Sequence, residues 1–348
     1  MKKQSSNIAE RIVAREQLAN SLRAIEAARY EPVYSQQDEH ERVSEFNAAL
    51  FTESFFSQPL TDYAVGFRDP SDVDKELEFF APEVPVSERF SYSQWDNPEE
   101  WLSELTDDQR PIKADFKEVE YTSFKVAAEC ANRGLQITLD MDQVRARSDF
   151  EEFYTQKLLR RLKRNELRRA LALLQVAAVN TAMAWNTSAG KDPDQDVIVE
   201  LIAGADASGI KPNRVGYSDT AWARRMLAHR AQTTAGGFGS AALTTEQLAG
   251  LYGVEQVLNS KSRFTTGLTT KAQALSNQVL MFNAASGMDT EDPSNIKRFV
   301  ANGAAEEGGG RYQVYSQRIS SKRWVIAVGF YSTIRITSTL GLRRFTVS

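Results

Sequence analysis

The stretch that decides the fold comprises residues 148–185 and reads SDFEEFYTQKLLRRLKRNELRRALALLQVAAVNTAMAW. Its apolar residues recur every three or four positions, which predicts one long helix from about Asp149 to Trp185. Glu151 follows Ser148 at the spacing of a capping box, so we expect Ser148 to cap this helix. At 1.5 Å per residue the helix spans roughly 55 Å and needs packing partners along its whole length. On its own, the pattern is as typical of a core helix in an ordinary α/β protein as of an assembly unit.

The predicted helix is basic in its first half and apolar in its second half. Residues 170–185 are apolar around most of the helix circumference, which predicts burial on several sides. This run is shorter than the ~20 residues that cross a bilayer, and Gln175, Asn180 and Thr181 interrupt it, so we exclude a transmembrane helix. The basic side chains of the helix are Lys157, Arg160, Arg161, Lys163, Arg164, Arg168 and Arg169.

A strongly acidic segment precedes the basic helix. Residues 50–110 contain four basic and fifteen acidic side chains, a net charge of −11, whereas the whole chain of 348 residues carries −4. Two solvated faces would explain this asymmetry. The alternative is that the acidic segment lies on the basic helix, of the same chain or of a neighbouring one. The acidic side chains that we expect to make such contacts are Glu83, Glu88, Asp96, Glu99, Glu100, Glu104, Asp107 and Asp108.

The remaining sequence predicts a mixture of helices and strands. Residues 7–29 and 38–56 have helical patterns, whereas the prolines and the lost periodicity of residues 58–111 indicate an extended or looped excursion. Strands are expected in residues 116–139 and over 213–218, 254–260, 277–285 and 311–340, and helices over 193–207, 219–229 and 244–252.

Catalytic and metal-binding motifs are missing from the sequence. The only two histidines, His40 and His229, lack metal-ligand spacing, and the single cysteine, Cys130, excludes an internal disulfide and indicates a buried apolar residue. The Gly-rich stretches 236–240 and 306–312 lack the strand–turn–helix context of a phosphate loop and indicate mobile loops. We therefore expect no catalytic residue, no cofactor and no metal site.

Two groups of aspartates have a structural explanation. Asp140 and Asp142 stand where a helix or turn begins, and the sequence KDPDQD at residues 191–196 precedes an expected helix. Carboxylates at these positions accept hydrogen bonds from the first N–H groups of a helix and stabilise its positive end. We therefore expect capping rather than acid–base catalysis.

The order of these segments resembles the major capsid proteins of tailed bacteriophages, which have the Hong Kong 97-type fold. The resemblance depends on the sequence of several local matches. They are FFAPEVPVSERFSYSQW (79–95), KEVEYTSFKVAAECANRGLQITLDMDQ (117–143), LLRRLKRNELRRALALL (158–174) and PNRVGYSDTAWARRMLAH (212–229), followed by a β-rich end.

The resemblance implies an α+β fold with five parts. These are an N-terminal helical arm over 1–56, an extended acidic loop with adjoining strands over 57–137, a peripheral domain with a long spine helix over 138–186, an axial domain over 187–307, and a β-rich return to both domains over 308–348.

The resemblance also implies a function. Such a protein is structural rather than enzymatic and self-assembles as pentamers and hexamers into an icosahedral shell around the viral double-stranded DNA. We expect it in the virion capsid after assembly in the host cytoplasm, with no membrane partner. Its implied partners are copies of itself, DNA on the inner face, a portal and a separate scaffolding protein. A separate scaffolding protein is implied because no long coiled-coil region precedes the arm. The sequence leaves open whether a decoration protein binds.

The basic helix has two competing roles in such a shell. Its cations would contact the acidic loop of a neighbouring subunit, or they would face the packaged DNA. We favour the loop for most of them, because the shell must be held while the DNA stays mobile. Two rival interpretations of the whole chain are an encapsulin-type nanocompartment with the same fold and an oligomeric α/β enzyme with an unrecognised site.

Overall fold

The computed structural model describes residues 56–69, 72–94, 124–188, 190–232, 235–267, 269–287, 292–301 and 311–348. All of them belong to the second of the chain's two units, Phe56–Ser348. The helix predicted over 7–29 lies outside the described residues, as do residues 38–55 of the helix predicted over 38–56. Outside them too are Asp96, Glu99, Glu100, Glu104, Asp107 and Asp108.

The predicted long helix forms as α7, Phe150–Ala177, and is shorter than predicted. Asp149 occupies its N-cap position without a side-chain hydrogen bond, so the predicted capping box at Ser148 is wrong. The predicted end at Trp185 is also wrong, because residues beyond Ala178 form strand β5, Val179–Met183. Strand β5 pairs in parallel with β14, Arg343–Val347, and this long-range pairing takes the chain out of the helix.

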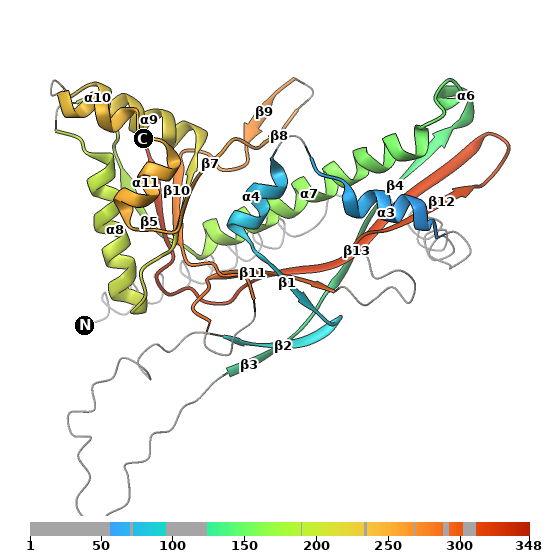
Figure 1. Cartoon of the computed structure of the whole chain (residues 1–348), viewed down its shortest axis with the longest axis horizontal. Coiled ribbons are helices and arrows are strands. Elements are labelled where there is room, and N and C mark those ends of the chain that lie inside the picture. The colour runs from blue at the N-terminus through green and yellow to red at the C-terminus, as the bar shows by residue number, and fades with distance from the viewer. Residues whose placement is uncertain are drawn as a thin grey trace, which may run out of the picture. The chain divides into compact units, whose positions relative to one another are not determined.

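One five-stranded sheet packs along the first half of α7 (Figure 1). Its order is β1–β11–β13–β12, and β4 also pairs with β13. The strands are β1, Glu83–Val86; β4, Ala131–Asp140; β11, Ile296–Ala301; β12, Gln313–Arg318; and β13, Arg323–Ile336. Leu158, Leu159 and Leu162 of α7 form one core with Ile326 and Val328 of β13, because i, i+4 spacing places these leucines on one helix face.

A second five-stranded sheet has the order β5–β14–β10–β6–β7. Its other strands are β6, Arg214–Ser218; β7, Gln256–Ser260; and β10, Gln278–Phe282. The helices grouped with it in Figure 1 are α8, Pro193–Ser208; α9, Asp219–Arg230; α10, Ala235–Ala241; and α11, Thr245–Tyr252. Val197 and Leu201 of α8 pack in one core with Val215 and Tyr217 of β6. Three of these helices confirm predictions, and local caps explain why: the Ser218 hydroxyl accepts from Ala221 N, and Thr244 forms a capping box with Gln247.

The predicted excursion over residues 58–111 is wrong for its first part, where two helices form. Residues 58–80 form two helices, α3, Gln58–Gly66, and α4, Val73–Phe80, and both pack on α7. Pro59 is in the first turn of α3, where a missing N–H costs nothing. Phe80 of α4 stacks on Phe282 of β10 and belongs to a core with Leu171 and Leu174 of α7. The structure of this segment therefore depends on tertiary contacts that local periodicity does not report.

The smaller elements complete the described structure. They are α6, Met141–Val144, and two hairpins, β2–β3 (Arg89–Gln94 with Phe124–Glu129) and β8–β9 (Arg263–Thr265 with Lys271–Gln273). The mobile loop predicted at residues 236–240 is wrong, because this stretch lies in α10. Gly237 permits a close approach there: a Cβ at this position would lie 2.6 Å from the carbonyl oxygen of His229. Within the described ranges, no helix is long and apolar enough to cross a membrane.

Candidate functional site

The basic residues of α7 separate into groups by exposure. Arg160 and Arg169 are half-buried, and Lys163 is buried, with 5% of its surface exposed. The four exposed residues, which we call the basic ridge, are Lys157, Arg161, Arg164 and Arg168. Their spacing of four, three and four places them on one face of the helix. That spacing is visible in the sequence, and it could have separated the ridge from the other three cations.

Two cations beside the ridge, Lys163 and Arg160, lie close to acidic residues of the same chain. The ammonium Nζ of Lys163 lies 2.9 Å from Asp74 Oδ1 and donates to the carbonyl oxygen of Phe67 at 3.0 Å. Arg160 Nε lies 4.0 Å from Asp69 Oδ1. Part of the acidic segment therefore lies on the basic helix within one chain, which is one of the two arrangements predicted from the charge asymmetry.

A buried charge cluster connects α7 to the first sheet. We call it the junction cluster and define it as Glu83, Glu166, Arg298 and Arg311. Glu166 of α7 is fully buried and accepts from Arg311 Nη2 at 2.7 Å. Glu83 Oε2 lies 2.7 Å from Arg311 Nη1 and 3.1 Å from Arg298 Nη2. Glu83, predicted as a loop contact, therefore holds two arginines inside its own subunit, whereas Glu88 is exposed.

Burial and charge act in opposite directions in the junction cluster. Burial alone would lower the pKa of Arg311, but the neighbouring Tyr312, Glu166 and Glu83 outweigh it and raise that pKa. Because two carboxylates balance two guanidinium groups, the cluster is neutral and its ions are paired.

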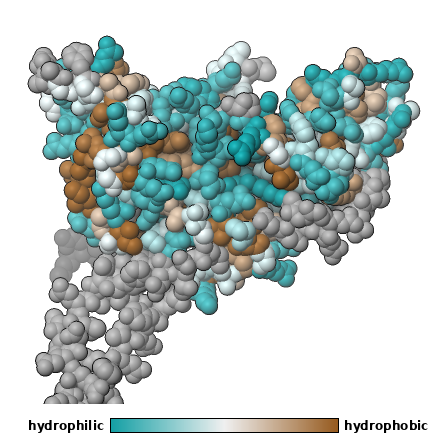
Figure 2. Space-filling view, in the orientation of Figure 1, coloured by the Kyte–Doolittle hydropathy of each residue, from teal (hydrophilic) through white to brown (hydrophobic). Residues whose placement is uncertain are grey.

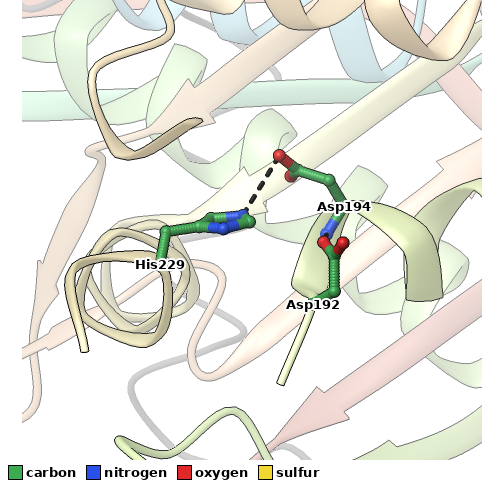
Figure 3. Close-up of side chains that lie close together, drawn as sticks. All are labelled: Asp192, Asp194 and His229. Carbon is green, nitrogen blue, oxygen red and sulfur yellow. Dashed lines mark hydrogen bonds and ion pairs between the residues drawn. The ribbon is translucent and has the colours of Figure 1, made fainter. Parts of the chain in front are cut away.

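A second buried cluster surrounds Asp194 in the first turn of α8. Arg225 donates from Nε and Nη2 to the two carboxylate oxygens at 2.6 and 2.8 Å, and the Tyr252 hydroxyl donates at 2.6 Å. His229 points toward the same carboxylate, with Nε2 at 3.1 Å (Figure 3). Burial raises the pKa of Asp194, but the nearby His229 and the hydrogen bonds from Arg225 outweigh it and hold that pKa well below its usual range.

Asp192, Asp194 and His229 are close enough to suggest a metal site, since their ligand atoms lie within 4.8 Å of one another. The geometry does not fit one. Asp192 Oδ1 already accepts from the backbone N–H groups of Asp194 and Gln195, which confirms the predicted helix cap. Arg225 occupies both oxygens of Asp194, and its positive charge would repel a cation. No local pattern in the sequence indicates this cluster, because its members come from separate helices.

Other predicted structural roles are confirmed. Asp140 caps α6 by accepting from Asp142 N at 2.9 Å. Cys130 is buried, and burial raises the pKa of its thiol, so it is poorly suited to act as a nucleophile.

An open cleft of about 440 Å³ lies between α7 and the β8–β9 hairpin. Its lining residues are Asn165, Arg168, Arg169, Ala172, Gln175, Phe264 and Ala274. The guanidinium carbon of Arg168 lies 4.2 Å from the ring centroid of Phe264, a cation–π contact. The cleft therefore joins the basic ridge at Arg168.

No family model and no curated protein matches this sequence. Solved structures do match. A phage-related protein from Bordetella bronchiseptica RB50 has a TM-score of 0.60 and 17% identity, covering 83% of this chain and 96% of that one. The capsid structure of Cyanophage P-SCSP1u has a TM-score of 0.50 and 10% identity, covering 78% of this chain and 88% of that one. At these identities the likeness establishes a fold.

Proposed function

We propose that this chain, whose fold is the Hong Kong 97-type fold of tailed-phage capsid proteins, is the subunit of a phage capsid shell. The observation that carries the proposal is the likeness to the cyanophage capsid over 78% of the chain. The clusters around Glu166 and Asp194 support a structural role, because their charged groups contact one another inside the subunit.

In this proposal the two sheets correspond to the two domains of a shell subunit. Helix α7 and the first sheet form the peripheral domain, predicted over residues 138–186, and the second sheet with α8–α11 forms the axial domain, predicted over 187–307. Strands β11 and β5 cross these predicted bounds, because β11 at 296–301 pairs in the first sheet and β5 at 179–183 pairs in the second. Residues 308–348 return to both, which agrees with β12 and β13 in the first sheet and β14 in the second.

An exposed apolar surface supports contacts between copies. Figure 2 has apolar side chains gathered over α8 and α11. Val199 and Ile202, three residues apart on one face of α8, are 57% and 52% exposed. Exposed apolar patches on soluble proteins mark interaction surfaces. We assign this surface to a second copy of the chain in the assembled shell.

The finer features of the proposal follow from the shell function. Copies associate as pentamers and hexamers into a closed icosahedral particle, which needs non-covalent contacts repeated by symmetry. The particle encloses double-stranded DNA, assembles in the host cytoplasm and uses a portal and a separate scaffolding protein. No enzymatic activity is assigned.

Particle size tests the proposal. The full chain is expressed and measured by light scattering and electron microscopy, and we expect closed particles of megadalton mass. A defined dimer or tetramer of the 39.0 kDa chain, about 80–160 kDa, would favour the oligomeric enzyme instead. Particles filled with protein cargo and devoid of nuclease-protected DNA would favour the nanocompartment.

A further inference from the structure

The basic ridge is a row of like charges on a chain with a net charge of −4. Every exposed side chain of α7 between Glu152 and Ala172 belongs to the ridge. From Lys157 to Arg168 it extends roughly 16 Å, at 1.5 Å per residue. Like charges one helical turn apart repel each other and destabilise the helix. An anion bound beside these side chains would offset part of this repulsion.

Aromatic rings position two of the ridge cations. Lys157 Nζ lies 4.2 Å from the ring centroid of Phe153 and 5.0 Å from that of Tyr154, and Arg168 lies over Phe264. A ring face attracts the cation without accepting its N–H groups in the way that a carboxylate does. These donors are held in place and can still hydrogen-bond an anion.

Arg169 extends the positive charge into the cleft between α7 and the β8–β9 hairpin. Burial and then the nearby charge of Arg133 lower the pKa of Arg169. Among the described residues, no group accepts a hydrogen bond from its buried Nε. Asn165 and Gln175 add neutral amide donors to the lining, which contains no carboxylate. An anion in this cleft would offset the repulsion between the arginines.

A second cleft of the described structure lacks this property. It lies beside α4 and α7, and its lining mixes both signs of charge: Asp69, Asp72, Asp74, Glu78 and Glu83 with Arg68, Lys75, Lys163, Arg298 and Arg311. Carboxylates of the subunit itself neutralise much of the positive charge there. The cleft at Arg168 and Arg169 is therefore the better candidate for an external anion.

The composition of the ridge favours a nucleic acid over an acidic protein segment. Protein interfaces have an apolar core with a polar rim, whereas the exposed side chains of the ridge are all cationic. Arginine, lysine and amide side chains are the usual donors to nucleic-acid phosphates. This assignment differs from the sequence-based preference for a neighbour's acidic loop, because Arg160 and Lys163 already contact acidic residues within the subunit.

We propose that the basic ridge and the adjoining cleft at Asn165, Arg168, Arg169 and Gln175 bind the phosphodiester backbone of a nucleic acid without reading its sequence. This inference rests on the proposed function, since a shell subunit presents one face to a genome. The ridge supplies a row of charges, and the cleft supplies hydrogen-bond donors for a phosphate.

Salt-dependent binding of DNA tests the proposal. A fluorescent 20-base-pair duplex of random sequence is titrated with the unassembled full chain, whose size is checked by light scattering, at 50–200 mM KCl. For Arg168→Gln with Arg169→Gln, we expect the slope of log affinity against log salt to fall by about two, and the affinity to fall about tenfold. Arg168→Lys with Arg169→Lys keeps the charge and should retain most of the slope.

The matched control removes two exposed arginines elsewhere. Arg318→Gln with Arg323→Gln makes the same change in net charge beside the turn between β12 and β13, and should leave the slope nearly unchanged. Equal losses in the two double variants would overturn the proposal, as would tighter binding of a labelled hexaglutamate peptide than of the duplex. Particle formation is scored separately, so a chain that assembles but binds DNA elsewhere contradicts only this inference.

Discussion

At the scale of single residues, buried ion pairs connect elements that are far apart in the chain. Glu166 lies with its carboxylate between Arg311 at 2.7 Å, Arg298 at 3.6 Å and the Ser332 hydroxyl at 2.9 Å. Removing one partner of a buried pair leaves an uncompensated charge in a medium of low polarity. The energetic importance of Glu166 therefore lies in the two arginines that it balances.

Glu166→Gln should reduce the free energy of unfolding by about 3–5 kcal/mol, because Arg298 and Arg311 lose the most deeply buried of the carboxylates that balance them. Urea titration of the purified chain measures this loss. Glu78→Gln is the matched control: its side chain is 53% exposed and lies 3.3 Å from the same Arg298. Its removal should cost at most about 1 kcal/mol. Similar losses in both variants would show that the junction cluster is not the cause.

Asp194→Asn should change how stability depends on pH. The pKa of Asp194 is lower in the folded chain than in the unfolded one, where an aspartate titrates near 3.9. Its stabilisation is therefore fully present above about pH 5 and decreases progressively as the pH falls below about 4 toward the folded-state pKa. Denaturation midpoints at pH 7, 5, 4 and 3 should differ most between wild type and variant at pH 7 and converge in acid. A gap that stays constant down to pH 3 would contradict this assignment.

The candidate site could be predicted only in part from the sequence. The seven cations of α7 lie in one stretch of sequence, so the sequence alone shows that the helix is basic. Their division into the basic ridge and the three less exposed cations depends on which face of α7 is covered by α4. Asp74 of α4, which contacts Lys163, is far from it in the chain. The Asp194 cluster joins α8, α9 and α11, and no spacing rule connects Arg225 and Tyr252 to it.

At the scale of elements, the sequence predicted those helix ends that depend on a capping residue close by in the chain. Helices α9 and α11 have caps at Ser218 and Thr244, within three residues of the N–H groups that they satisfy. The C-terminal end of α7 has no such signal, because the apolar run continues beyond it. Strand β5 forms there because its backbone pairs with that of β14. Periodicity reports which face is apolar, and it does not report which distant strand will cover that face.

Gly216 sets the distance between β6 and α4. A Cβ at this position would lie 2.6 Å from Phe80 Cε1 and 2.9 Å from Phe80 Cζ. Gly216→Ala should therefore reduce the free energy of unfolding by about 1–3 kcal/mol, because the packed rings cannot move aside without strain. Gly250→Ala provides the control, since a Cβ there meets nothing within 4 Å and α11 gains about 0.5–1 kcal/mol of helix preference. Thermal denaturation should shift in opposite directions for the two variants.

At the scale of the whole molecule, the basic ridge and the apolar surface of α8 lie on different helices. The basic ridge lies on α7, whereas the exposed apolar residues Val199 and Ile202 lie on α8. If the first surface contacts nucleic acid and the second contacts copies of the chain, substitutions should separate the two activities. Additivity of distant sites supports testing them independently.

Val199→Glu with Ile202→Glu should block particle formation while leaving the subunit folded, because both side chains are more than half exposed. Light scattering measures assembly, and circular dichroism checks folding. The control is Gln195→Glu with Asp206→Glu, which changes two exposed positions of the same helix without introducing charge at its apolar centre. Normal particles from the first variant would remove α8 from the assembly surface.

Strand β14 has a consequence for the timing of synthesis. It lies between β5 and β10, so the second sheet consists of two separate parts until residues 343–347 are available. During translation, β5 leaves the ribosome long before its partner and waits with unpaired backbone groups. A nascent chain cannot complete its second sheet until this late strand inserts, so unfinished chains lack the finished surface that copies would recognise. We therefore expect the second sheet to be completed only after translation has passed residue 347.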